Sequence, residues 1–207
     1  MTSGSARSCI LLLLLVLNVA VQAADVRRYP LADRGAILLT VPEGWREEVR
    51  RPDPNLPPTI IYSSLTGASF QVLVTPIWPF SPDIPQPSED ELRENVRSAG
   101  ESVRPQAVET EIKIEEFRGS ETFAWYFSVT DRAPQAGAYR YMTQGIMGLA
   151  DLRVTFTMLT NDGSETIVPR ALDMLKGARR ERAGGAVRPP SAAVDHRPRV
   201  AIAGPSH

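Results

Sequence analysis

The stretch from Glu121 to Thr160 constrains the fold most, because it predicts three consecutive antiparallel strands. Side chains in 122–130 alternate with a period of two residues, which is the period of a β-strand. One face carries large apolar residues: Phe123, Trp125, Phe127 and Val129. The other carries Thr122, Ala124, Tyr126, Ser128 and Thr130. We expect the first face to be buried under helices, with two further strands at 139–147 and 151–160 joined by short antiparallel connections.

Further strand signals on both sides of this stretch predict a larger sheet. They fall at 36–41, 45–50, 59–63, 69–75 and 109–117. Apolar and polar residues alternate in 69–75 and 109–117, 36–41 is a short apolar run, and turn-forming residues separate the runs. The polar composition of 45–50 favours an edge strand. We therefore predict an α+β fold, in which an antiparallel β-sheet of about six to seven strands is sandwiched by helices.

Two helices are predicted, and the first has a clear start. Ser88 and Glu91 have the spacing of a capping box, in which each side chain binds the other residue's backbone N–H. An apolar stripe at helical spacing follows: Leu92, Val96, Ala99 and Val103. A second helical stripe runs from 167 to 175, and Pro169 requires that helix to begin close to it. Gly177 is its expected C-terminal cap.

The two ends of the chain differ from the domain between them. Residues 1–23 read as a secretory signal peptide, with a basic start, an apolar run and a small-residue cleavage site ending at Ala23. The alternative of an uncleaved membrane anchor stays open. We expect a single folded domain over 26–176, and a disordered tail rich in Arg, Pro and Ala over 177–207. The mature protein is then periplasmic or secreted, with no stable membrane span.

The positions of cysteine and histidine exclude several kinds of chemistry. The single cysteine, Cys9, leaves with the signal peptide, and both histidines, His196 and His207, lie in the predicted tail. The domain therefore has no residues for the usual catalytic triads or for a zinc site, and we expect no metal and no cofactor. The domain is acidic and only the tail is basic, which argues against nucleic-acid binding.

Carboxylate chemistry remains as an alternative. Four glutamates lie close together in the predicted strand at 109–117: Glu109, Glu111, Glu115 and Glu116. A carboxylate-based hydrolase would need two of them facing each other across a cleft. We interpret them instead as a solvated strand edge, because Glu109, Glu111 and Glu115 share one face. Residues 161–164 could offer oxygen ligands for calcium, but a turn explains them better.

Two groups of residues are candidates for binding. Trp78 and Phe80 lie in a proline-rich loop, which could hold both rings ready for contact with a partner. The alternative is that the two rings cap the core. The second group is Tyr126, Tyr139 and Tyr141 on the polar face of the central strands. If no helix covers that face, it could form a shallow groove.

The order of the elements over residues 29–176, together with the turn Val41-Pro42-Glu43-Gly44-Trp45, resembles the Mog/PsbP-like superfamily. The resemblance implies an antiparallel sheet sandwiched by helices, and a role in binding or assembly, as for a bacterial secreted member. We therefore predict an exported, non-catalytic binding or assembly protein that meets a protein partner in the bacterial cell envelope. The alternatives are a small-ligand carrier in the periplasm and the carboxylate-based hydrolase.

Overall fold

The computed structural model describes residues 25–53, 56–65, 70–78 and 88–183. The predicted signal peptide and most of the predicted tail lie outside these residues, so both stay predictions. Within the described part of the chain, no helix is both long and apolar enough to span a bilayer.

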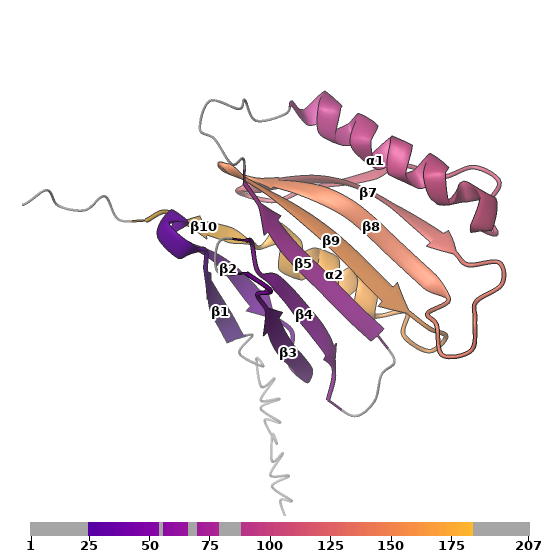
Figure 1. Ribbon diagram of the computed structural model, residues 1–207, viewed down its shortest axis with the longest axis horizontal. Coiled ribbons are helices and arrows are strands. Elements are labelled where there is room, and N and C mark those ends of the chain that lie inside the picture. The colour runs from indigo at the N-terminus through magenta and orange to yellow at the C-terminus, as the bar shows by residue number, and fades with distance from the viewer. Residues whose placement is uncertain (1–24, 54–55, 66–69, 79–87, 184–207) are drawn as a thin grey trace, which may run out of the picture.

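A seven-stranded sheet forms the centre of the molecule (Figure 1). Its strands are β3 (Trp45–Arg50), β4 (Thr59–Ser64), β5 (Phe70–Ile77), β6 (Glu115–Arg118), β7 (Thr122–Thr130), β8 (Tyr141–Leu149) and β9 (Leu152–Thr160). They lie in the order β3-β4-β5-β9-β8-β7-β6, and every neighbouring pair is antiparallel. The polar strand β3 is an edge strand, as predicted.

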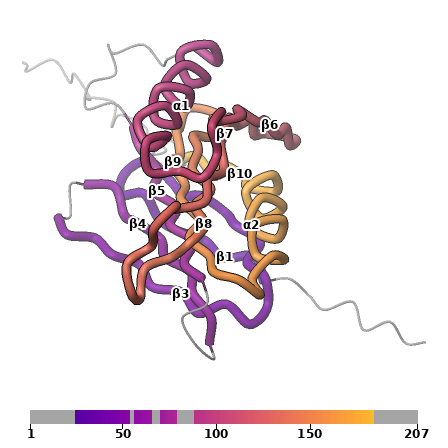
Figure 2. The backbone as a smooth tube through the Cα atoms, turned by 90° about the vertical axis from the view of Figure 1, so that its right-hand side faces the viewer, coloured from indigo at the N-terminus to yellow at the C-terminus, as the bar shows by residue number. Residues whose placement is uncertain are grey.

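The remaining elements lie on the two faces of this sheet (Figure 2). The helix α1 (Glu89–Val103) covers one face, with the short 3-10 turn η2 (Arg104–Gln106) after it. The other face carries α2 (Ile167–Lys176) and a three-stranded sheet of β1 (Asp25–Pro30), β2 (Ala36–Val41) and β10 (Arg179–Glu181). The turn η1 (Ala32–Arg34) joins β1 to β2. The predicted α+β class is confirmed.

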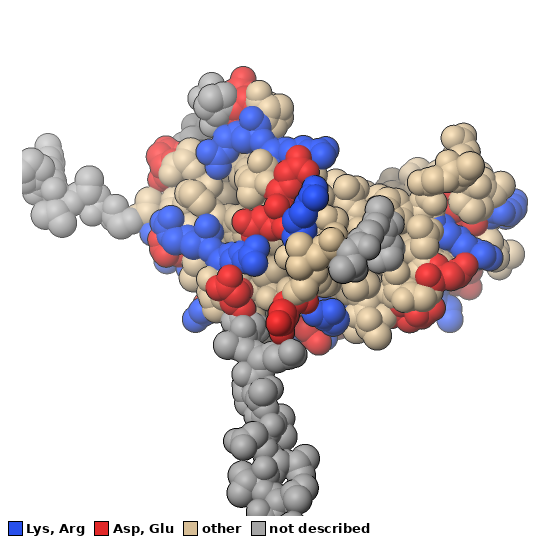
Figure 3. Space-filling model, turned by 90° about the horizontal axis from the view of Figure 1, so that it is seen from below, with Lys and Arg blue, Asp and Glu red and all other residues tan. Residues whose placement is uncertain are grey.

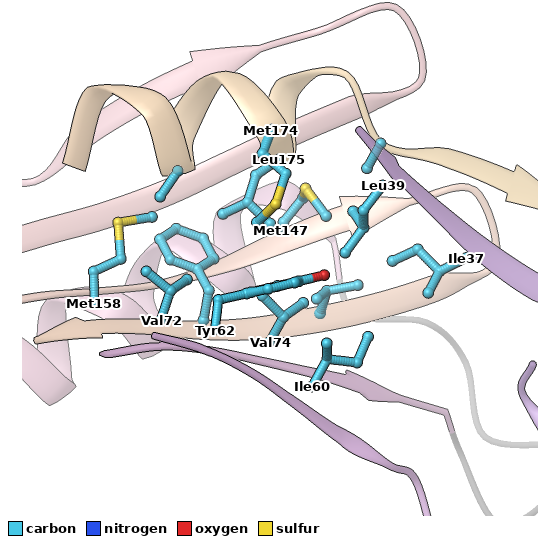
Figure 4. Packing of buried hydrophobic residues seen from close by; sticks show 14 of the residues in the cluster. Ile37, Leu39, Ile60, Tyr62, Val72, Val74, Met147, Met158, Met174 and Leu175 are labelled. Atoms are coloured by element: carbon cyan, nitrogen blue, oxygen red, sulfur yellow. The ribbon is translucent and has the colours of Figure 1, made fainter. Parts of the chain in front are cut away.

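The larger hydrophobic cluster fills the space between the main sheet, α2 and the three-stranded sheet (Figure 4). Ile37 and Leu39 enter it from β2, and Met174 and Leu175 enter it from α2. Gly145 in β8 lies against this cluster, and only glycine fits there, because a Cβ would lie 2.5 Å from the Phe156 ring. A second, smaller cluster lies under α1 and is built from Val96, Ala107, Ile112, Phe127 and Val129.

Both faces of strand β7 carry buried residues, although Ser128 is exposed, so the prediction of one polar face is wrong. Phe127 and Val129 pack under α1 as expected. On the opposite face Ala124 and Tyr126 belong to the larger cluster and are 1% and 8% exposed. That face is dry because α2 and the three-stranded sheet form a second cover, which the alternation within one strand could not reveal.

Several strand boundaries also differ from prediction, and two of the differences lie beside β7. The strand expected over 109–117 forms only at 115–118. At its predicted start the Thr130 N–H of β7 is bound by the side chain of Glu109, at 2.9 Å, and not by a backbone carbonyl of a paired strand. Strand β8 begins at Tyr141 and not at 139. At the C-terminus, β10 lies inside the predicted tail and pairs with β2, so the fold continues to at least Glu181.

Candidate binding surface

Paired residues on neighbouring strands point to the same face of a sheet, so one row of pairs defines the side that faces α1. The row runs from Phe127 under α1 across β8, β9, β5 and β4. Its members in order are Phe127, Gln144, Thr157, Leu73 and Ile61. We call the part of this side on β4, β5 and β9 the open face.

Helix α1 packs mainly on β7 and β8, so it covers one half of this side of the sheet. Figure 1 shows the helix along one border of the sheet, with β4, β5 and β9 extending beyond it. Thr75, Thr155 and Thr157 on the open face are half-buried side chains. The open face therefore presents a sheet surface that none of the described helices covers.

Three hollows have their floors on this one side of the sheet. The first, of about 490 Å³, lies over Ile61 and Leu73 and is bordered by Arg50 and Arg51. The second, of about 100 Å³, lies between α1 and Ile146. The third, of about 250 Å³, lies at the C-terminal end of α1. All three hollows therefore open on the side of the sheet that faces α1.

A row of threonines crosses the open face. The Thr59 and Thr75 hydroxyls lie 3.0 Å apart and share a hydrogen bond, and the Thr155 hydroxyl donates to the Thr75 carbonyl oxygen at 3.4 Å. These hydrogen bonds hold the threonine hydroxyls in fixed positions, and each hydroxyl oxygen keeps a lone pair that can accept a further hydrogen bond. The open face thus combines apolar residues with an ordered row of hydroxyls and carries few charges.

The third hollow, which we call the α1-end pocket, has a lining of mixed chemistry. Apolar side chains come from α1, from β7 to β9 and from the segment after η2: Val103, Ala107, Val129, Met142 and Leu159. Polar residues complete it: Gln106, Thr130, Asp131, Tyr139 and Arg140. Sequence reasoning singled out only Tyr139 among them. The alternating apolar residues of β8 and β9 were the available signal, but they do not reveal where α1 ends above the sheet.

Arg140 is held in place at the border of this pocket. Its backbone N–H donates to the Asn161 side chain at 2.9 Å, and its carbonyl oxygen accepts the Asp131 N–H at 2.8 Å. Its guanidinium lies 5.7 Å from the Tyr141 ring centroid and 3.5 Å from an oxygen of Asp162. The other Asp162 oxygen accepts the Tyr141 hydroxyl at 2.5 Å.

The predicted loop site is only partly within the described residues. Trp78 is half-buried and packs against the larger hydrophobic cluster, with the Arg34 guanidinium 5.6 Å from its ring centroid. This placement favours the alternative reading, in which the ring caps the core. Phe80 lies outside the described residues.

The three predicted tyrosines do not form one site. Tyr126 lies in the larger cluster, where burial and the hydrogen bond to Glu115 raise the pKa of its phenol to about 12. Tyr139 lines the α1-end pocket on the opposite side of the sheet. Tyr141 points to the same side as Tyr126 but lies at the sheet's end, where its hydroxyl donates to Asp162. The condition for a tyrosine groove, an uncovered face, is not met at Tyr126.

The predicted carboxylates have separate partners. Glu109 accepts from the backbone and hydroxyl of Thr130, and Glu115 accepts from Tyr126. No cluster of three or more possible metal ligands occurs among the residues that the structure describes. Figure 3, which views the molecule from below relative to Figure 1, shows basic and acidic side chains interspersed on that surface.

No protein-family model and no curated protein matches this chain. One solved structure that is similar to it is the solution structure of the cyanobacterial PsbP protein, CyanoP, from Synechocystis sp. PCC 6803. The two share 12% sequence identity with a TM-score of 0.44, over 78% of this chain and 96% of the other. The fold class stated above rests on the sheets and helices of this chain alone.

Proposed function

We propose that this chain is an exported, non-catalytic binding protein of the bacterial cell envelope, and that a protein partner binds its open face. The N-terminal sequence supports export to the periplasm or beyond, because a short apolar run precedes a small-residue cleavage site. We further propose that it is a bacterial secreted member of the Mog/PsbP-like superfamily. The order of its elements, with a capped helix before the meander and a helix after it, supports that placement.

The main support for a protein partner is the composition of the open face. Protein interfaces have a core that is poor in charge and a rim that is polar. The open face has this arrangement, since Leu73 and Ile61 lie at its floor and Arg50 and Arg51 at its border. The ordered threonine row adds fixed hydroxyls that a partner's polar groups could meet.

Site-specific photocrosslinking in cells that express the full-length chain tests the proposal. A photoreactive amino acid is placed at Thr157, in the middle of the open face, or at Thr110, an exposed position beyond it. We expect one envelope protein to be crosslinked from position 157 and not from 110. A Thr157→Arg change in the purified protein should then weaken binding of that protein, while Thr110→Arg should not. Equal crosslinking from both positions, or none from 157, would overturn the proposal.

A small-ligand carrier is the second candidate function, and the α1-end pocket favours it. Its volume of about 250 Å³ lies just below the range of about 300–1,000 Å³ in which drug-sized ligands bind. Native mass spectrometry of protein purified from the envelope should reveal a bound small molecule. Its absence, together with no binding by added apolar ligands, would remove this candidate.

A further inference from the structure

The α1-end pocket offers an apolar floor that is closed from below by the sheet. Val129, Met142 and Leu159 come from three adjacent strands, and Val103 from the last turn of α1 forms the wall above them. Met142 and Leu159 are half-buried, so each side chain keeps surface that a ligand can cover. Covering such surface releases water and stabilises a bound apolar group.

The acidic groups near this floor already accept hydrogen bonds from N–H groups. Asp131 accepts the backbone N–H of Ala133 at 2.9 Å. Glu109 accepts the Thr130 N–H at 2.9 Å and the Thr130 hydroxyl at 2.8 Å. These carboxylates hold the loop and strand end in place.

Arg140 is differently placed, because its charge is poorly matched by its neighbours. Its contact with Asp162 is long, at 3.5 Å, and joins side chains that are 51% and 71% exposed. Exposed ion pairs of this kind contribute little. A guanidinium has five N–H donors in a planar fork that suits a carboxylate. Arg140 lines the pocket, and Asp162 is the one carboxylate that its guanidinium contacts among the described residues. Its backbone is fixed by Asn161 and Asp131.

We propose that the α1-end pocket binds a medium-chain fatty acid, with the apolar chain on Val129, Met142 and Leu159 and the carboxylate on Arg140. The volume of about 250 Å³ suits chains such as those of octanoate and decanoate. This inference rests on the second of the two proposed functions, the binding of a small ligand. It adds the chemical class of that ligand and the residue that recognises its head group.

Calorimetric titration of the protein with decanoate and with decanol tests the inference. We expect Arg140→Gln to weaken decanoate binding by about tenfold or more, because a hydrogen-bonded charge is lost, and to leave decanol binding unchanged. Arg97→Gln is the matched control, since Arg97 is 49% exposed and also has one carboxylate partner. It should change neither affinity.

A second pair of variants tests the place of the apolar chain. Val103→Phe should fill the pocket and abolish decanoate binding, whereas Val108→Phe, at an exposed valine that does not line it, should have no effect. Equal affinities for decanoate and decanol that Arg140→Gln leaves unchanged would overturn the carboxylate assignment and leave the carrier function standing. If neither ligand binds, the carrier function fails as well.

Discussion

The guanidinium of Arg180 donates a hydrogen bond to the Asp151 carboxylate at 3.0 Å and so joins β10 to the turn between β8 and β9. The same side chain donates to the carbonyl oxygens of Arg34, the last residue of η1, and of Ala36, the first residue of β2. It is only 3% exposed. One buried arginine thus connects the last described strand to the first part of the chain and to the central meander.

Replacing Arg180 should therefore destabilise the fold. We expect Arg180→Met to lower the free energy of unfolding by about 2–3 kcal/mol, because buried carbonyl oxygens lose a charged donor. The neighbouring exposed arginine gives the control, and Arg179→Met should cost less than about 0.5 kcal/mol. Urea unfolding followed by circular dichroism measures both. Equal midpoints for the two variants would contradict a structural role for Arg180.

Acid should weaken the attachment of the segment after η2. Burial would raise the pKa of the Glu109 carboxyl, but the hydrogen bonds from Thr130 outweigh it and hold that pKa below its ordinary value of 4.5. A lowered carboxyl pKa stabilises the fold above pH 4.5, and this contribution is lost as the pH falls through the folded value. Glu109→Gln should thus lower the urea midpoint more at pH 7 than at pH 3.

The control for this prediction is Glu111→Gln, which changes an exposed glutamate two residues further on. It should shift the midpoint little at either pH. A Glu109→Gln effect of the same size at both pH values would show that the charge of Glu109 is unimportant.

Gly145 should not tolerate a methyl group. A Cβ there would lie 2.5 Å from the Phe156 ring and 2.6 Å from the Tyr126 Cβ, on strands that flank β8. We expect Gly145→Ala to cost about 2–3 kcal/mol through overpacking. At Gly177 the nearest atom to a Cβ would be 3.5 Å away, so Gly177→Ala should cost less than about 1 kcal/mol. Thermal and urea unfolding compare the two, and equal costs would contradict the prediction.

Tyr126 should ionise late. Its pKa of about 12 in the fold compares with about 10 for an unfolded chain. The neutral phenol therefore stabilises the fold below about pH 10, and that contribution is lost as the pH rises through 12. Ultraviolet absorbance is titrated for the wild type and for Tyr126→Phe, and the difference between the two curves reports the ionisation of Tyr126 alone. We expect its midpoint near pH 12 in buffer and at about pH 10 in urea. Coinciding midpoints would show that Tyr126 is not buried against Glu115.

Local signals in the sequence were sufficient for the elements that depend on near neighbours. The capping box is confirmed, since the Ser88 hydroxyl accepts the Glu91 N–H at 3.2 Å and the Glu91 carboxylate accepts the Ser88 N–H at 2.7 Å. Gly177 caps α2 as predicted. Most of the predicted strands also form close to their expected positions, because turn-forming residues separate them in the sequence.

Features that depend on distant contacts were missed. Strand β10 consists of Arg179, Arg180 and Glu181, which carry no apolar pattern, so only its pairing with β2 makes it a strand. The strand predicted to end at residue 75 continues through Pro76 in β5, at a point where β9 is its neighbour and the pairing with β4 has ended. The place of Arg140 beside the α1-end pocket also depends on a distant contact, since it is set by where α1 ends above the sheet.

The position of β2 between β1 and β10 has a consequence for the order of folding. Residues 36–41 are made early, but one of their two neighbours is residues 179–181, almost at the end of the described chain. Closing a loop of this length is slow and comes late. The three-stranded sheet, and the cover it gives the core, can be completed only after nearly the whole domain has been synthesised.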